Sequence, residues 1–191
     1  MWNRSQIEAG DLLDSVKKPG RKRVDIMSNC RKAEKKELSR ICEIYGVARR
    51  FMRDNGNDVQ WGESDAPESR LEADIEAGNL YILEEEGELY GVFAFIVGDD
   101  PAYSVIEQGE WKSDTPYAAI HRVASDGSRH QVLGRIMEFA KNEIPHIRID
   151  TYEKNFVMQK ALAREDFEKR GIIHVADGTP RIAYEWVRQE L

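Results

Sequence analysis

The spacing of apolar residues along the chain separates predicted helices from predicted strands. Between residues 35 and 51, apolar side chains recur every three or four positions among charged ones, which predicts an amphipathic helix packed on a core. A second helix is expected over residues 68–77, where Gly78 provides the stop. Residues 80–85 and 89–98 predict two strands, and the second is apolar at successive positions. Because both faces of that strand look buried, we expect helices on both sides of the sheet.

The second half of the chain has the pattern of a strand, a helix and a parallel strand. Apolar residues at 120–124 predict a strand, 125–130 a polar turn, 131–142 a helix and 147–151 a second strand, with another helix entered near Asn155. A turn leading from such a strand into a helix aims backbone N–H groups and the positive end of the helix dipole at one point. We therefore expect a phosphate group to bind there.

Two stretches have more than one interpretation. Residues 99–117 form a long connection whose aromatic residues argue for order, either as a flap near a substrate or as a loop that these rings pin to the domain. Residues 171–175 and 181–187 predict a hairpin with an Asp-Gly turn. Tyr184 and Trp186 share one face of its second strand, which favours core packing and leaves a pocket wall or a homodimer seam as alternatives.

Composition limits the organisation of the chain and its compartment. With 191 residues, of which 41% are hydrophobic, residues 26–191 are expected to form a single domain. Residues 1–25 are predicted to be an N-terminal extension, either a solvated leader or an upstream start, or else an arm for docking or for a nucleic-acid contact. The sequence contains no apolar run long enough to span a bilayer and no signal-peptide core, so we expect a cytoplasmic protein without membrane contact. Cys30 and Cys42 are then expected to be buried free thiols.

Net charge changes the expected partner. The formal charge of −7 argues against nucleic-acid binding, because neutralising phosphates requires a basic face. An acidic surface suits a cationic amine. The histidines at 130, 146 and 174 lack ligand spacing, so no metal site is expected.

The strand, turn and helix at 120–142 resemble those of the GNAT superfamily, the acyl-CoA-dependent N-acetyltransferases. The likeness continues through the second strand, IRIDT, the positions Asn155, Met158, Gln159, Leu162 and Phe167, and the tail 171–184, with a first half resembling a bacterial subgroup. The resemblance implies an α/β (α+β) fold with a central mixed, mostly antiparallel sheet, helices on both faces and a splayed strand pair at the acyl-CoA site. It implies that the protein transfers an acetyl group from acetyl-CoA to a primary amine by direct attack.

The turn departs from the family pattern Q/R-x-x-G-x-G/A. The aligned residues are 128–133, so Gln131 and Leu133 stand where the family has small residues, and we expect their side chains to lie where the ligand passes. Gly134 comes one residue late. A second hypothesis follows from this loss: a GNAT-fold protein with weakened or lost catalysis, acting as a binding or regulatory module.

The resemblance implies a set of acetyl-CoA contacts along the strand end, the turn and the two helix starts. The oxyanion donor would be a backbone N–H at or near Val123. The expected contacts are Val123, Ala124, Ser125, Arg129, His130, Gln131, Val132, Leu133, Gly134 and Asn155. Asn155 is also consistent with an ordinary helix N-cap.

Catalytic side chains are weighed against structural alternatives. Strand alternation puts His121 on the face opposite Ile120 and Arg122, where it could enter an acceptor pocket beside Trp61 as a general base, or be structural. The family's usual tyrosine is here Leu162, so Tyr152 is the candidate acid for the departing thiolate, with a surface role as the alternative. Together with Trp61 and His121, Tyr103 from the long connection is the remaining expected substrate contact.

Overall fold

The computed structural model describes residues 29–58, 60–61 and 68–189. The described chain forms one sheet with the strand order β1-β2-β3-β4-β5-β7-β6. Its strands are β1 Asn29–Lys32, β2 Leu80–Glu85, β3 Glu88–Val97, β4 Ala118–Ser125, β5 His146–Thr151, β6 Glu168–His174 and β7 Pro180–Val187. Its helices are α1 Leu38–Asp54, α2 Glu68–Glu76, α3 Val132–Glu143 and α4 Phe156–Arg164, with short 3-10 turns η1 Lys35–Glu37 and η2 Pro101–Tyr103.

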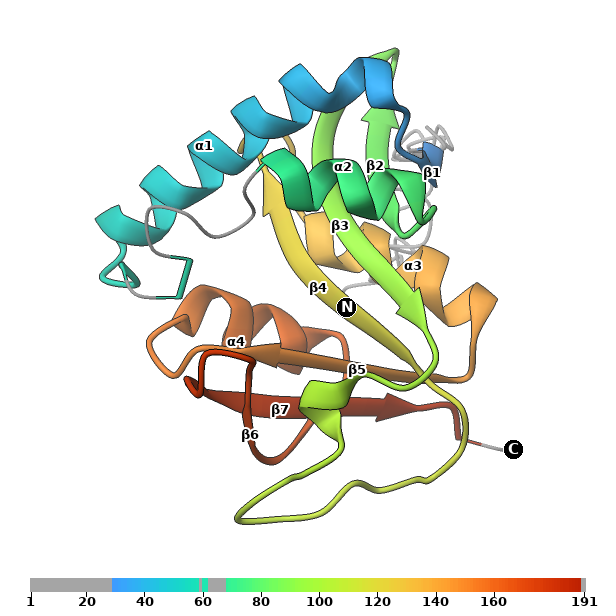
Figure 1. Ribbon diagram of the computed structural model, residues 1–191, viewed down its shortest axis with the longest axis vertical. Coiled ribbons are helices and arrows are strands. Elements are labelled where there is room, and N and C mark those ends of the chain that lie inside the picture. The colour runs from blue at the N-terminus through green and yellow to red at the C-terminus, as the bar shows by residue number, and fades with distance from the viewer. Residues whose placement is uncertain (1–28, 59, 62–67, 190–191) are drawn as a thin grey trace, which may run out of the picture.

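The sheet is mixed and mostly antiparallel, as the resemblance implied. In the described part of the chain, β4 and β5 are the parallel pair, and their pairing ends at Ile120 and Ile149. Beyond that rung the two strands diverge, which opens the sheet between the half formed by β1–β4 and the half formed by β5–β7 (Figure 1). The predicted splayed pair is therefore present.

A β-bulge in β4 was not predicted. Ala94 of β3 pairs with His121, whereas Val92 pairs with Ala124, so β4 has one residue more than β3 over this stretch. Arg122 takes up the extra residue with a φ of 52°, in the left-handed region. The sequence analysis assumed that side chains alternate between the two faces of β4, which put His121 and Arg122 on opposite faces. The bulge interrupts this alternation, so both side chains lie on the same face, where His121 contacts Asp100 and Arg122 contacts Asp74 of α2.

Helices cover both faces of the first half of the sheet. Leu38, Ile41 and Ile44 of α1 pack with β2 and β3 residues on one face, which we call the front. Leu133, Ile136 and Met137 of α3, with Leu162 of α4, build a second core on the back. Within β3, Phe93 and Phe95 face the back while Val92 and Ala94 face the front, as predicted.

No helix of the described chain covers the front of β5–β7; residues 99–117, the flap, do so instead. Tyr103 and Tyr117 of the flap are buried against Ala119, Ile173 and Ala183. Glu107 pairs with Ile172 on β6, as both N–H···O distances of 2.8 Å show. These aromatic residues therefore pin the loop to the domain, and a role of the same loop near a substrate stays a prediction. Helices lie on both faces of the sheet as expected, those on the front over β1–β4.

The flap is anchored by a buried polar network under its second half. His146 has no exposed surface, and its Nε2 lies 2.8 Å from Glu185 Oε1 while its Nδ1 lies 2.9 Å from the carbonyl oxygen of Thr115. Arg148 donates to the carbonyl of Ser113 at 2.8 Å. The Lys112 N–H donates to Glu185 at 2.6 Å. Flap and sheet are thus joined by charged groups as well as by aromatic packing.

The remaining predictions can be compared directly. The hairpin forms with Gly178 at a φ of 80°, and Tyr184 is buried in the core with Trp186 packed against it. Both cysteines are free, but each is only partly buried, so the expectation of buried thiols is met only in part. Burial raises the pKa of Cys30 to about 12. No helix of the described residues is long and apolar enough to cross a membrane. The predicted extension, residues 1–25, lies outside the described residues.

Candidate functional site

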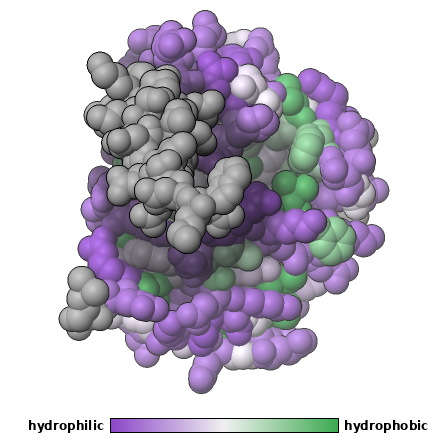
Figure 2. All heavy atoms as spheres, turned by 180° about the vertical axis from the view of Figure 1, so that it is seen from behind, coloured by the Kyte–Doolittle hydropathy of each residue, from purple (hydrophilic) through white to green (hydrophobic). Residues whose placement is uncertain are grey.

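A cavity of about 700 Å³ lies beside the diverging ends of β4 and β5. Its wall is formed by the end of β4, the turn that follows, and the beginnings of α3 and α4. Figure 2 shows the face of the molecule on which the surface is hollowed and on which hydrophobic side chains gather. Every predicted acetyl-CoA contact lines this one cavity: Val123, Ala124, Ser125, Arg129, His130, Gln131, Val132, Leu133, Gly134 and Asn155.

The turn between β4 and α3 is held from two sides. Asp126 accepts a hydrogen bond from the Ser128 N–H at 2.8 Å and an ion-pair contact from Arg40 of α1 at 2.5 Å. Burial opposes ionisation of Asp126, but these donors outweigh it and lower the pKa of Asp126. The turn is thus fixed before any ligand arrives, which favours binding because less ordering is required.

The two residues expected to stand in the ligand's way differ. Gln131, the N-cap of α3, has a φ of 59°, and its exposed side chain makes no capping bond. This is a left-handed conformation, which explains why a glycine would suit the position. Leu133 instead turns into the back core with 7% of its surface exposed. Most of the Leu133 side chain therefore packs in the core although the residue also lines the cavity, and obstruction of a ligand by Leu133 stays a prediction.

Charge at the anion-binding end of the cavity is mixed. The N-terminus of α3 points into it, and exposed Arg164 and His130 line it. Arg129 is bound to Glu85 of β2. Glu165 also lines the cavity, and a Cβ added at Gly134 would lie 3.0 Å from its Oε1. A bound phosphate would therefore meet one carboxylate near the helix N-terminus.

The opposite wall of the cavity is apolar and comes largely from α1. Val47, Ala48, Phe51 and Met52 line it, and Trp61 completes it with its ring 5.5 Å from that of Tyr45. Sequence reasoning placed Trp61 at the site but treated α1 as a core helix only. The exposed fraction of Phe51, 51%, is high for a core position and is consistent with a wall facing a ligand.

A junction at Gln60 ties the segment before Trp61 to α4 and β7. Its Oε1 accepts from Asn155 Nδ2 and from Asn57 Nδ2, each at 2.9 Å, and its carbonyl accepts from Arg181 at 3.2 Å. Asn155 also caps α4, because its Oδ1 accepts from the Met158 N–H at 3.1 Å. The N-cap interpretation of Asn155 is correct, and the amide has a second partner that the sequence did not indicate.

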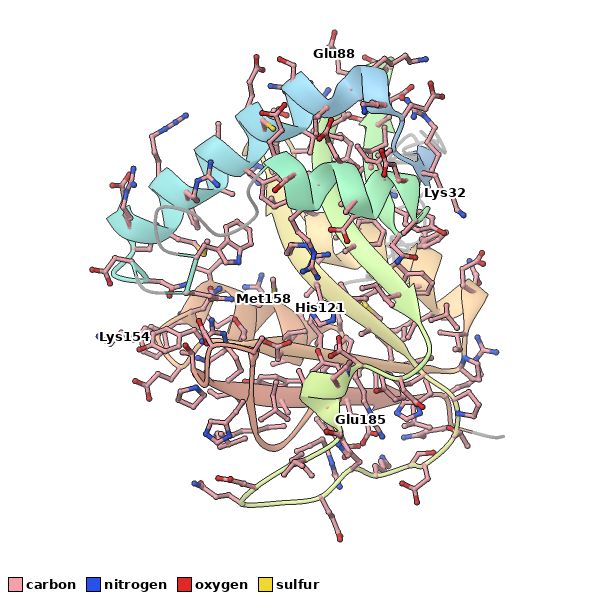
Figure 3. The ribbon with its side chains drawn as sticks, viewed as in Figure 1. Lys32, Glu88, His121, Lys154, Met158 and Glu185 are labelled. Carbon is pink, nitrogen blue, oxygen red and sulfur yellow. The ribbon has the colours of Figure 1, made fainter. Side chains whose placement is uncertain are left out.

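His121 lies outside this cavity, on the front of the sheet between α2 and the flap (Figure 3). Its Nε2 is 2.8 Å from Asp100 Oδ2, and its Nδ1 is 3.7 Å from Asp150 Oδ1. Tyr103 donates to Asp150 at 2.8 Å. Asp150, which the sequence analysis did not select, faces His121 at the first position past the last β4–β5 rung. Among the predicted substrate contacts, the structure brings Tyr103 and His121 together and leaves Trp61 apart in the cavity.

Asp100 and Asp150 have opposite pKa shifts. The hydrogen bond from His121 lowers the pKa of Asp100. Burial raises the pKa of Asp150, although His121 and the Tyr103 hydroxyl act in the other direction. Tyr103 itself is 2% exposed, and burial raises its pKa. The Tyr103 hydroxyl is therefore a neutral donor.

Tyr152, the candidate acid, is also outside the cavity. Its ring lies 5.4 Å from the guanidinium carbon of Arg181. Leu162, at the position of the family's tyrosine, is fully buried in the back core. Among the described residues, no group of three His, Cys, Asp or Glu side chains could hold a metal ion.

Comparison with known proteins identifies the fold. No protein-family model matches the chain, and no curated protein matches its sequence. A GNAT-family acetyltransferase from Streptococcus agalactiae superposes with a TM-score of 0.75 at 28% identity, over 85% of this chain and 96% of its own. One from Listeria monocytogenes gives 0.64 at 19%, over 84% and 94%.

A third structure has a bound ligand. It is a Salmonella typhimurium protein, described as an acetyltransferase with its cofactor acetyl-CoA, with a TM-score of 0.55 at 16% identity over 85% of this chain and 95% of that one. The splayed β4–β5 pair and these structural neighbours agree that the chain has the GNAT fold.

Proposed function

We propose that the protein is an N-acetyltransferase that transfers the acetyl group of acetyl-CoA to a small primary amine. The observation that carries the proposal is the cavity, because every residue expected to contact acetyl-CoA lines it, beside the point where β4 and β5 diverge. The Salmonella typhimurium neighbour, solved with acetyl-CoA, supports this choice of co-substrate.

The parts of the cavity suit different parts of acetyl-CoA. The N-terminus of α3 and Arg164 suit the phosphates, because backbone N–H groups, the helix dipole and a guanidinium all favour anions. The end of β4, Val123 to Ser125, suits the pantetheine arm and offers a backbone N–H to the thioester oxygen. Trp61 and the α1 wall suit apolar parts of either substrate.

Roles for side chains follow the same proposal. His121 is the candidate base, since it lies on the front of the sheet next to the bulge. Tyr152 is the candidate acid for the thiolate, and replacement by Phe with full turnover retained would remove it from that role. The acceptor is expected to enter from the front, on the side of His121, Tyr103 and Trp61. A cytoplasmic location, a homodimer and the absence of nucleic-acid binding remain predictions.

A second candidate is a GNAT-fold module that binds a ligand without efficient catalysis. Two observations favour it. Gln131 keeps a side chain at a left-handed position where a glycine would leave space, and Glu165 puts a carboxylate next to the first turn of α3. Both would weaken the binding of a pyrophosphate.

Calorimetric titration with acetyl-CoA separates the two candidates. Desulfo-CoA and adenosine 3′,5′-bisphosphate serve as controls for the pantetheine arm and for the nucleotide. We expect micromolar binding of acetyl-CoA that weakens when the pantetheine arm is absent, followed by amine-dependent release of the thiol in a screen of primary amines. Absence of acetyl-CoA binding would refute the enzyme and favour the module.

A further inference from the structure

The flap contributes charged and polar groups to the front of the β4–β5 splay. Asp100 lies at the start of the flap, as the N-cap of η2, and Tyr103 lies within η2. Both reach residues of the sheet: Asp100 contacts His121 of β4, and Tyr103 contacts Asp150 of β5, each at 2.8 Å. His121 and Asp150 are the first residues past the last β4–β5 rung. The flap therefore contacts one side chain on each of the two diverging strands, His121 on β4 and Asp150 on β5.

The hydrogen bonds determine which nitrogen of His121 is free. An ionised carboxylate only accepts hydrogen bonds, so the 2.8 Å contact with Asp100 requires a hydrogen on Nε2. In the neutral ring the Nδ1 lone pair is then unprotonated and faces Asp150 across 3.7 Å. The low pKa of Asp100 agrees with this assignment. Asp100 acts on His121 as an orienting carboxylate does, by fixing the tautomer.

The space between Nδ1 and Asp150 fits an ammonium group. At 3.7 Å the two atoms are too far apart for a hydrogen bond to each other, but one nitrogen can lie about 2.9 Å from both. The side chains of Asp100, His121 and Asp150 keep 17%, 16% and 11% of their surface exposed, so the group is reachable. Asp150 has its other oxygen 4.0 Å from Arg181, and Tyr103 fixes the near one.

The other charged groups on this face are already paired. Arg122 donates to Asp74 of α2 at 2.6 Å, and Arg70 lies 3.6 Å from the same carboxylate. Arg181 is shared between Asp150 and the carbonyl of Gln60. Asp100 and Asp150 therefore face the opening with one arginine each nearby, Arg122 for Asp100 and Arg181 for Asp150. Because Arg122 is already paired with Asp74, this balance favours one additional positive charge between the two carboxylates.

We propose that His121 Nδ1 and Asp150 Oδ1 bind the acceptor as its ammonium ion, and that the flap residues Asp100 and Tyr103 are the positioning residues of this site. The inference rests on the proposed N-acetyltransferase function and assigns the residues that hold and deprotonate the amine acceptor of that reaction. His121 takes one proton from the ammonium on Nδ1, and the imidazolium is held by Asp100.

The remaining steps balance without another reagent. The freed lone pair forms the C–N bond at the thioester carbonyl, and the C–S bond breaks with its electrons on sulfur. The thiolate takes a proton from its acid, for which Tyr152 is the candidate, and the second proton of the nitrogen restores that acid. His121 returns its proton to solvent. Ammonium and thioester become amide, thiol and one released proton.

The test uses the full chain and n-butylammonium as the probe, with 1-butanol as the neutral control of equal length. The ring signals of the histidines are followed by NMR, and the signals that disappear in His121→Gln are assigned to His121. We expect the His121 ring of the free protein to be the Nε2–H tautomer and to shift saturably with butylammonium only. Asp150→Asn should weaken that response at least tenfold, and Asp100→Asn should alter the tautomer. Asp99→Asn, one residue away and exposed, should change neither.

Several results would overturn the proposal. These are an Nδ1–H tautomer in the wild type, equal shifts with 1-butanol, or an unchanged response in Asp150→Asn. If Asp150→Asn fails to fold, the wild-type comparison of the two probes decides alone. Acetyl-CoA binding is measured on the same samples. Its presence without a butylammonium response removes only the ammonium site, whereas its absence removes the proposed function.

Discussion

Replacing Gln131 by glycine separates the cost of a backbone conformation from the obstruction of a ligand. Gln131 has a φ of 59°, and its side chain makes no capping hydrogen bond that would compensate this left-handed conformation. A side chain in that region costs about 1–2 kcal/mol. Glycine itself lowers the stability by about 0.5–1 kcal/mol, because it increases the conformational freedom of the unfolded chain. We expect Gln131→Gly to be more stable by about 0.5–1 kcal/mol, which raises the Tm by about 1–4 °C for a chain of this size.

The binding assay uses a second variant to identify the obstructing atoms. Gln131→Ala keeps Cβ and the left-handed strain but removes the rest of the side chain. If the side chain obstructs the pyrophosphate, both variants should tighten acetyl-CoA binding about fivefold, which corresponds to about 1 kcal/mol. Gln108, exposed in the flap with a φ of 55°, provides the control: Gln108→Gly should raise the Tm and leave acetyl-CoA binding unchanged. Unchanged affinity in both Gln131 variants would refute the obstruction, and an unchanged Tm in Gln131→Gly would refute the strain.

Three further predictions test the cap, the flap contact and the buried network. Asn155→Ser keeps a cap oxygen and loses the donor to Gln60, so calorimetry should show weaker acetyl-CoA binding at near wild-type Tm, whereas Asn155→Ala should also lose about 1 kcal/mol of stability. Equal stability of the two variants would contradict the cap, and wild-type affinity in Asn155→Ser would contradict a role for the Gln60 contact. Gly109→Ala would bring a Cβ to 1.8 Å from the Arg170 carbonyl oxygen and should cost about 1–3 kcal/mol in urea unfolding. Gly46→Ala in α1, whose Cβ would make only an ordinary contact of 3.7 Å with Arg50 Nη1, should gain about 0.5–1 kcal/mol. Burial alone would raise the pKa of Glu185, but His146 and the Lys112 N–H donate to it and the net effect lowers that pKa. Its contribution is therefore present above the unfolded glutamate pKa of about 4.3 and is lost as pH falls toward the lower folded value. Glu185→Gln should cost about 3 kcal/mol at pH 7 and flatten the stability profile below pH 4.5, and a parallel profile in the variant would contradict this.

The elements of the fold were predictable because each one has a local signature. The apolar period of α1, the Glu86-Gly87 turn before β3 and the alternation in β7 all arise from near neighbours in the chain. The cavity was predictable for a related reason. A strand, a turn and a helix in sequence order necessarily bring the end of β4 and the start of α3 together, so contacts inferred along 123–134 lie on one wall.

The features that the sequence analysis did not predict depend on pairings between residues that are distant in the sequence. The bulge at Arg122 exists because β3 and β4 differ by one residue between two rungs, and neither strand shows this alone. A non-glycine residue with positive φ gives no signal in the sequence, and both Arg122 and Gln131 are of this kind. Asp150 was not selected as a site residue, because its partner Tyr103 is 47 residues earlier in the chain.

The flap is the segment in which the fold and the candidate site depend on the same residues. The ring of Tyr103 packs against Ala119 and Ile173, and its hydroxyl donates to Asp150. One side chain therefore both attaches the flap to the sheet and orients a carboxylate where β4 and β5 diverge. Asp100 begins the flap and holds His121. The His146–Glu185 network anchors the second half of the flap and does not contact His121. Loss of that network should nevertheless disturb His121, since the position of the flap determines the position of Asp100. In the histidine NMR spectrum of Glu185→Gln, a displaced His121 signal in protein that is still folded would demonstrate this coupling, and an unmoved signal would show that Asp100 and Tyr103 keep their places independently of the anchor.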